Sequence, residues 1–210
     1  PVPKETVKSK PWERYTSVKV SPDGSMIAWV ANDWGKRRIW IYDTATGKKK
    51  KIFTAEPKYE QSVDHTYPVL AWHPGGKILT FVNEEKGGMQ LYFYRTDQKN
   101  FEQRAMPFFE KVLSFSYSPD GTRLLISAVS NGMTDIYVHT IISGTNERLT
   151  FDVADDFDPS FIRGRDETII FSSNRLTDSL TNRGNPQEMV GLNYNLFTYE
   201  PAGVTPAVIR

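Results

Sequence analysis

A short turn motif recurs along this 210-residue chain at nearly regular intervals. It reads Ser21-Pro22-Asp23-Gly24, His73-Pro74-Gly75-Gly76 and Ser118-Pro119-Asp120-Gly121, with a degenerate fourth copy near Arg163-Gly164-Arg165-Asp166. The prolines of the first three copies are 52 and 45 residues apart, and an aliphatic residue that opens a β-rich stretch follows each by 17 positions. Such a period is typical of propellers in which each repeat forms one blade of four strands. The repeats therefore predict an all-β propeller of four-stranded antiparallel blades, with about four blades present.

Local signals within each repeat agree with this fold. Proline presets φ for the turn, aspartate bonds its own backbone, and glycine adopts a positive φ. In the first repeat we expect strands over 17–20, 26–30, 38–42 and 50–54, and the later repeats follow the same order. The expected blades are roughly 12–55, 67–107, 112–150 and 158–210. We assign to packing between blades the strand aromatics Trp29, Trp40, Trp72, Phe81, Tyr92 and Phe115.

Composition and the absence of certain motifs exclude several classes of function for this chain. The formal net charge is +1, so no global field would attract nucleic acid or an anionic membrane, and the lysine run 48–51 follows a hairpin glycine as a solvated turn. No apolar run of about 18 residues is available for membrane insertion. Cysteine is absent, which excludes disulfides and a thiol nucleophile. Hydrolase-elbow, phosphate-loop and His-Glu-x-x-His motifs are absent too. We expect no catalysis by this chain, no cofactor and no nucleic-acid partner.

The residue pattern of the repeats resembles that of a known family. Ser-Pro-Asp-Gly, followed by the strands 27–29 and 39–43, resembles the WD40-like PD40 repeat of TolB-type propellers. The best match runs from Arg148-Leu149-Thr150 through an acidic loop and Pro159-Ser160-Phe161 to the stretch 169–175. The resemblance covers residues 12 to 205 and is greatest to the propeller segment of large secreted envelope proteins. It implies a periplasmic or secreted location and an envelope protein or peptide as partner. TolB-type proteins bind the peptidoglycan-associated lipoprotein, but no residue of that contact can be matched here.

Ring closure is a separate question. Propellers close with about 4 to 8 blades, and TolB-type rings usually have six or more. The chain starts at Pro1 without an initiator methionine and ends at Arg210 within an expected strand. We therefore expect a segment of a longer protein that forms part of a larger ring. The oligomeric state is left open.

The loops after the second and fourth strands of each meander lie at the same end of the sheet, so they share one face of a propeller. These loops are long and irregular, whereas the opposite face has only tight turns, and binding residues are concentrated on such loops. We call this surface the loop face. Its candidate binding residues, chosen by this geometry, are Asp64, His65, Asp155, Asp156, Asp158, Arg175 and Arg183.

Two segments of the loop face have alternative interpretations. The loop from Arg175 to Asn195 exceeds its counterparts by roughly fifteen residues, and such loops are either functional or flexible insertions. The acidic run 152–158 is either a calcium site, because hard cations bind clustered carboxylates, or a loop braced by hydrogen bonds. It lacks the spacing of an EF-hand, and bracing is favoured, so no metal is predicted.

The leading functional hypothesis is a non-catalytic scaffold of the cell envelope that binds a protein or peptide through the loop face. The alternative is an accessory propeller that gates substrate for a peptidase domain elsewhere in a longer polypeptide. A purely structural spacer is a third hypothesis. A His-Glu-x-x-His or Gly-x-Ser-x-Gly motif in the flanking sequence would favour the peptidase hypothesis.

Overall fold

Four antiparallel sheets of four strands account for nearly all regular structure in the computed structural model, which describes residues 12–56, 64–165, 167–177, 179–181, 184–200 and 204–208. The strands are β1 (Arg14–Val20), β2 (Met26–Asp33), β3 (Lys36–Asp43), β4 (Lys49–Ala55), β5 (Val69–Trp72), β6 (Ile78–Glu85), β7 (Gly88–Arg95), β8 (Asn100–Ala105), β9 (Lys111–Tyr117), β10 (Arg123–Ser130), β11 (Met133–Thr140), β12 (Thr145–Arg148), β13 (Asp156–Phe161), β14 (Ile169–Ser173), β15 (Asn195–Glu200) and β16 (Val204–Val208). Within the described residues the one helical element is a 3-10 turn, η1 (Pro186–Met189). Each sheet follows chain order, which confirms the predicted all-β fold of four-stranded blades.

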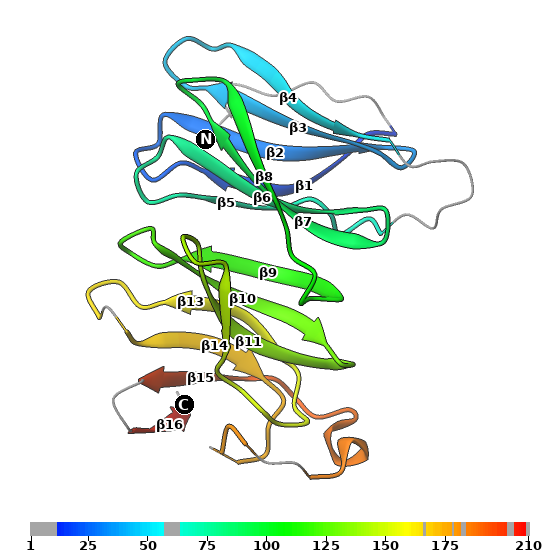
Figure 1. The fold of residues 1–210 in the computed structure, drawn as a ribbon, viewed down its shortest axis with the longest axis vertical. Coiled ribbons are helices and arrows are strands. Elements are labelled where there is room, and N and C mark those ends of the chain that lie inside the picture. The colour runs from blue at the N-terminus through cyan, green and yellow to red at the C-terminus, as the bar shows by residue number, and fades with distance from the viewer. Residues whose placement is uncertain are drawn as a thin grey trace, which may run out of the picture.

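The four sheets, which we number blades 1 to 4, stack in chain order along the long axis of the molecule (Figure 1). The first strand of each blade contacts the first strand of the next, in the pairs β1–β5, β5–β9 and β9–β13. Blades 1 and 4 lie at opposite ends of the view in Figure 1. The larger ring expected from the sequence stays a prediction.

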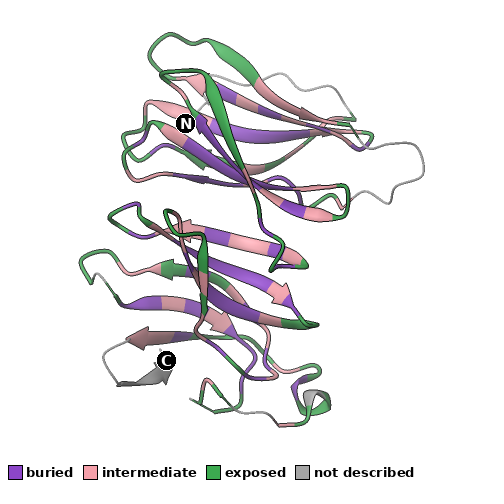
Figure 2. Cartoon of the chain, in the orientation of Figure 1, coloured by how far each residue is buried: buried purple, intermediate pink, exposed green. Residues whose placement is uncertain are grey.

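An apolar cluster fills each boundary between neighbouring blades. Blades 1 and 2 share a cluster that includes Val30, Ile39 and Phe81, and blades 3 and 4 share one that includes Ile136 and Phe171. Burial of a large apolar side chain contributes about 1.5–3 kcal/mol, so these boundaries hold the blades together. Figure 2 shows the consequence, with buried residues along the central strands and exposed residues along the outer strands β4 and β8.

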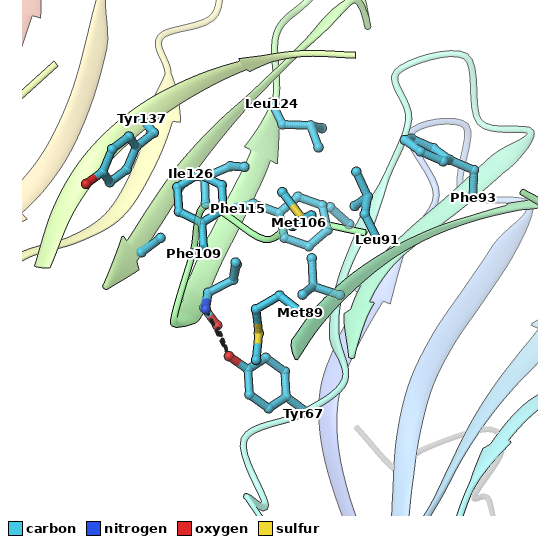
Figure 3. Close-up of a cluster of buried hydrophobic side chains, with 14 residues drawn as sticks. Tyr67, Met89, Leu91, Phe93, Met106, Phe109, Phe115, Leu124, Ile126 and Tyr137 are labelled. Atoms are coloured by element: carbon cyan, nitrogen blue, oxygen red, sulfur yellow. Dashed lines mark hydrogen bonds between the residues drawn. The ribbon is translucent and has the colours of Figure 1, made fainter. Parts of the chain in front are cut away.

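The boundary between blades 2 and 3 has the largest cluster, and a buried tyrosine joins its two sides (Figure 3). The Tyr67 hydroxyl donates to the carbonyl oxygen of Val112 at 2.8 Å and accepts from the Val112 N–H at 2.9 Å. Both polar groups of Val112 are thereby satisfied inside the protein, where an unpaired group would cost free energy. Tyr67 precedes β5, so this contact fixes the linker between blades 1 and 2 against the edge of blade 3.

The repeated turns adopt the conformation that their residues favour. Gly24, Gly76, Gly121 and Gly164 all have φ between 72° and 81°, and the left-handed region disfavours side chains with a Cβ. In the first turn the Ser21 hydroxyl donates to Asp23 at 2.6 Å. Hydrogen bonds from Ser21 and Ser25 lower the pKa of Asp23 to about 2. The degenerate fourth copy has lost the serine and the proline, but its Gly164 keeps the positive φ of the other three turns.

The histidine that replaces serine in the second turn also makes a hydrogen bond within its turn. The backbone N–H of Gly75 donates to Nδ1 of His73 at 2.9 Å, and His73 thus acts as a turn residue. Of the strand aromatics assigned to packing, all are buried except Trp40. Trp40 is half-buried, with the Lys49 ammonium 5.5 Å from its ring centroid.

Candidate functional site: the loop face

Where the structure describes them, the loops that follow the second and fourth strands do lie together, at the right of Figure 1. In three blades an asparagine at the end of the second strand connects the two kinds of loop. Asn32 bonds His65 at 2.9 Å, the Asn131 N–H donates to Glu110 at 2.8 Å, and Asn174 accepts from the Asp155 N–H at 2.8 Å. The loop face is therefore a connected surface whose loops brace one another.

Exposed apolar side chains are concentrated on this face. Of the thirteen exposed large hydrophobic residues among those described, eight lie in or beside its loops: Trp12, Trp34, Phe108, Met133, Phe151, Leu176, Val190 and Tyr194. By the same criterion two belong to the opposite face, Ile142 in a turn and Val20 directly before one. Apolar residues gathered on one side of a soluble domain mark an interaction surface more often than isolated ones do.

Asp64 and His65, two of the predicted binding residues, lie in the linker before β5. Oδ1 of Asp64 accepts from the N–H and the hydroxyl of Thr66, and Oδ2 pairs with Lys111 at 2.6 Å. Arg37 donates to the carbonyl oxygen of Asp64 at 3.1 Å. Burial alone would raise the pKa of Asp64, but the bonds from Lys111 and Thr66 outweigh it and lower the pKa to about 2. Asp64 thus holds the linker between blades 1 and 2 against Arg37 of blade 1 and Lys111 of blade 3.

Beside this linker is a concavity of about 490 Å³ at the end of blade 1. Its lining residues are Trp12, Arg14, Thr16, Asn32, Trp34, Gly35 and His65. Arg14 lies directly across from Asn32 in the β1–β2 pairing. The volume is within the roughly 300–1,000 Å³ range of small-ligand sites, and two exposed tryptophans form part of its wall. We call this the tryptophan pocket.

Two more of the predicted residues, Asp156 and Arg175, lie at the boundary of blades 3 and 4, where Arg175 is buried among carboxylates. Its Nη2 donates to both oxygens of Asp156 at 2.7 and 2.8 Å, and Nη1 lies 3.2 Å from Asp152. The guanidinium carbon is 5.1 Å from the ring centroid of Phe171, and Nε donates to Ser173. Arg175 and Asp156 therefore brace the base of the loop face beneath its surface.

Burial and the charge of neighbouring carboxylates govern the acids around this arginine. Burial raises the pKa of Asp152 and of Asp156 above the ordinary value, although the nearby Arg175 opposes this rise. Burial also raises the pKa of Asp135, which pairs with Arg148, to about 6. Within the described residues no group of three or more acidic or histidine side chains is placed to hold a metal ion. The bracing interpretation of the acidic loop thus has a direct structural basis in Arg175.

The remaining predicted residues differ in position. Asp155 is half-buried beside Asn174, and Asp158 is exposed in β13 with φ 50° where the β13–β14 register shifts. Arg183 lies outside the described residues. Asp155 also lines a second concavity of about 300 Å³ between the β10–β11 turn and the long loop, with Met133 and Val190 on its wall.

The long loop after β14 is anchored where the structure describes it. The carbonyl oxygen of Ser179 accepts from Arg175 at 3.1 Å, and that of Leu180 accepts from Phe151 at 2.7 Å. Met189, in η1, is buried. These contacts favour a shaped part of the loop face over a freely solvated insertion.

Sequence reasoning missed Trp34, Arg14 and Trp12. The signal that could have found Trp34 is the repeat itself, because the residue before the glycine in the equivalent turns is Lys86 in blade 2 and Asn131 in blade 3. A tryptophan at a turn position that is polar in blades 2 and 3 is the unusual feature of blade 1.

Comparisons with known proteins agree with the fold. No family model matches the chain. A segment of 91 residues is 28% identical to the Tol-Pal system protein TolB of Anaeromyxobacter dehalogenans strain 2CP-1. The matched segment covers 43% of this chain and 20% of that relative. Two solved structures are similar over most of the chain: TolB from Acinetobacter baumannii (TM-score 0.69, 17% identity, 93% of this chain and 43% of that one) and a putative TolB from Agrobacterium tumefaciens (TM-score 0.68, 17% identity, 91% and 63%).

A similar fold also occurs in peptidase structures. A structure of two prolyl endopeptidases gives a TM-score of 0.61 at 13% identity, over 95% of this chain and 28% of that one. At such identities the likeness shows the fold alone. The chain spans less than two thirds of each of these proteins.

Proposed function

We propose that this TolB-type β-propeller is a non-catalytic scaffold that binds a protein or peptide of the cell envelope through its loop face. The observation that carries the proposal is the uneven distribution of exposed apolar side chains, eight in or beside the loops of the loop face and two in or beside the turns opposite. Aromatic residues and arginine dominate the binding energy of protein interfaces, and both are present here.

The rigidity of the loops supports binding over passive solvation. Ordering a flexible loop on association costs free energy, which a preorganised surface avoids. Asn32, Glu110 and Asn174 already link neighbouring loops of the face. A partner would therefore meet a surface that is largely formed in advance.

We propose a periplasmic location, and the similarity of a 91-residue segment to Tol-Pal system proteins supports it. No helix among the described residues is long and apolar enough to cross a membrane. The partner we propose is accordingly a protein or peptide of the same compartment.

The test compares two exposed apolar positions on opposite faces. Trp34 is 88% exposed on the loop face and Ile142 is 87% exposed on the other. The full chain and its Trp34→Ala and Ile142→Ala variants are immobilised and exposed to an envelope extract of cells that express the protein. Each captured protein is then purified and titrated against the same three chains.

A partner that binds the wild type and Ile142→Ala but binds Trp34→Ala more weakly supports the proposal. A partner that distinguishes only Ile142→Ala contradicts it. Cleavage of a captured protein, in place of stable binding, would favour the peptidase-associated alternative.

A further inference from the structure

We propose that the tryptophan pocket binds a peptide segment of the partner in which a carboxylate lies next to an aromatic or aliphatic side chain. This inference deepens the proposed function of the loop face and rests on it. It assigns the site to blade 1, to Trp12, Arg14, Trp34 and His65, and it names the chemistry of the ligand.

The first support is the conformation of Trp34. Its φ is 51° and that of Gly35 is 84°, the pattern of a tight hairpin turn that asparagine and glycine favour. Lys86 and Asn131 occupy the equivalent left-handed position in blades 2 and 3. A bulky residue with positive φ is an outlier, and here its ring is exposed and gains little from burial. Strain held at an exposed aromatic residue points to a binding role.

The second support is that the pocket's polar wall is built in advance. Asn32 accepts from the Gly35 N–H through Oδ1 at 3.2 Å, so its amide nitrogen is the group that donates to Nδ1 of His65 at 2.9 Å. His65 therefore accepts at Nδ1 and carries its ring proton on Nε2, which is a donor. One asparagine thus fixes both the hairpin that carries Trp34 and the ring of His65.

The third support is charge. Among the described residues that line the pocket, Arg14 is the cation and none is a carboxylate. Among the described residues the Arg14 guanidinium makes no hydrogen bond or ion pair, in contrast to Arg37 and Arg38 nearby. Its donors match a carboxylate, and charge-assisted bonds of this kind are the strong ones.

The charge of Arg14 and the two tryptophan rings together indicate the class of ligand. An uncharged ligand would gain no charge-assisted hydrogen bond from Arg14. A polyanion such as nucleic acid would need a run of cations that one arginine does not supply. The two tryptophan rings offer apolar contact to a side chain beside the carboxylate. An acidic residue next to an aromatic or aliphatic residue satisfies both halves of the pocket.

The experiment is a selection from a displayed random library of 12-residue peptides against the purified full chain, with Trp34→Asn as the counter-selection bait. Asparagine is the residue of the equivalent turn in blade 3, so this variant keeps the hairpin. Enriched peptides are synthesised, and their dissociation constants are measured for the wild type, Arg14→Gln, Trp34→Asn and Ile142→Ala. Thermal unfolding of every variant verifies that it is folded.

We expect enriched peptides to pair aspartate or glutamate with an adjacent apolar residue. Arg14→Gln and Trp34→Asn should weaken their binding by about tenfold or more, consistent with the loss of a charge-assisted hydrogen bond, and Ile142→Ala should change it less than twofold. Replacing the peptide's acid by its amide should weaken binding to the wild type but not further to Arg14→Gln, because the two changes remove the same contact.

The proposal is overturned if no peptide is enriched over the counter-selection, if the enriched peptides lack an acidic residue, or if Arg14→Gln binds them as the wild type does. These results are distinguishable from a failure of the proposed function. An envelope partner that is lost in Trp34→Ala, together with peptides that ignore Arg14, would leave the loop face as the binding surface and refute only the ligand chemistry.

Discussion

The strained turn at Trp34 leads to a prediction in which a substitution increases stability. Replacing Trp34 with asparagine places in blade 1 the residue that blade 3 has at Asn131, with the same positive φ. The left-handed conformation costs an ordinary L-residue roughly 1–2 kcal/mol, and asparagine tolerates it better because its short side chain bonds locally. The variant should therefore relieve most of this cost.

The loss of tryptophan packing is small by comparison. Trp34 is 88% exposed, so its contacts bury roughly 20–30 Å² of the 150–250 Å² that a buried aromatic would cover. At about 25 cal/mol per Å² this burial contributes only ~0.5–0.8 kcal/mol. The net result is a gain of about 0.5–1 kcal/mol, or about 1–4 °C in Tm for a domain of this size.

Equilibrium unfolding in urea, followed by far-UV circular dichroism, measures the difference between Trp34→Asn and the wild type. Asn131→Trp is the matched reverse change and should lose a comparable amount. If Trp34→Asn were less stable than the wild type, the indole would be making contacts worth more than its strain. The argument that Trp34 is retained for binding would then fail.

Three further predictions concern the buried polar contacts. Tyr67→Phe leaves both backbone groups of Val112 unpaired and should lower the free energy of unfolding by about 1–3 kcal/mol, measured in urea. Arg175→Met leaves buried carboxylates without a cation and should cost about 3–5 kcal/mol; a loss below 1 kcal/mol in the same assay would refute the bracing role. In the folded state the pKa of Asp135 is raised from 3.8 to about 6. Between these two pH values the folded protein therefore binds more protons than the unfolded chain, and its stability falls as the pH rises from about 4 to about 6. Asp135→Asn should flatten the decline in Tm between pH 4 and 6, and an unchanged slope would contradict the assignment.

The fold was accessible from sequence because its determinants are local and repeated. Each copy of the turn motif carries its own glycine with positive φ, and the strands alternate between such turns. Repetition also placed the loops of one face together, as the bond between Asn32 and His65 shows. The degenerate copy at Gly164 kept its φ, so even the weakest repeat was interpretable.

The site was less accessible because its contacts join residues that are distant in the chain. A charged side chain in a loop is expected at the surface, yet Arg175 and Asp156 are buried because each neutralises the other. No periodicity encodes such a pair. Trp34 lies in a turn, where exposure is ordinary, and only comparison with Lys86 and Asn131 in the equivalent turns shows that a tryptophan there is unusual.

The central claim is that the loop face, and not the face opposite, meets the partner. The most direct measurement places a photoreactive benzoylphenylalanine at Val190, 76% exposed on the loop face, or at Ile142, 87% exposed on the other. The full chain is irradiated in intact cell envelopes, and adducts are separated by mass. The account predicts a discrete protein adduct from position 190 and none from 142. An adduct from 142 alone, or the absence of adducts from both positions, would contradict it.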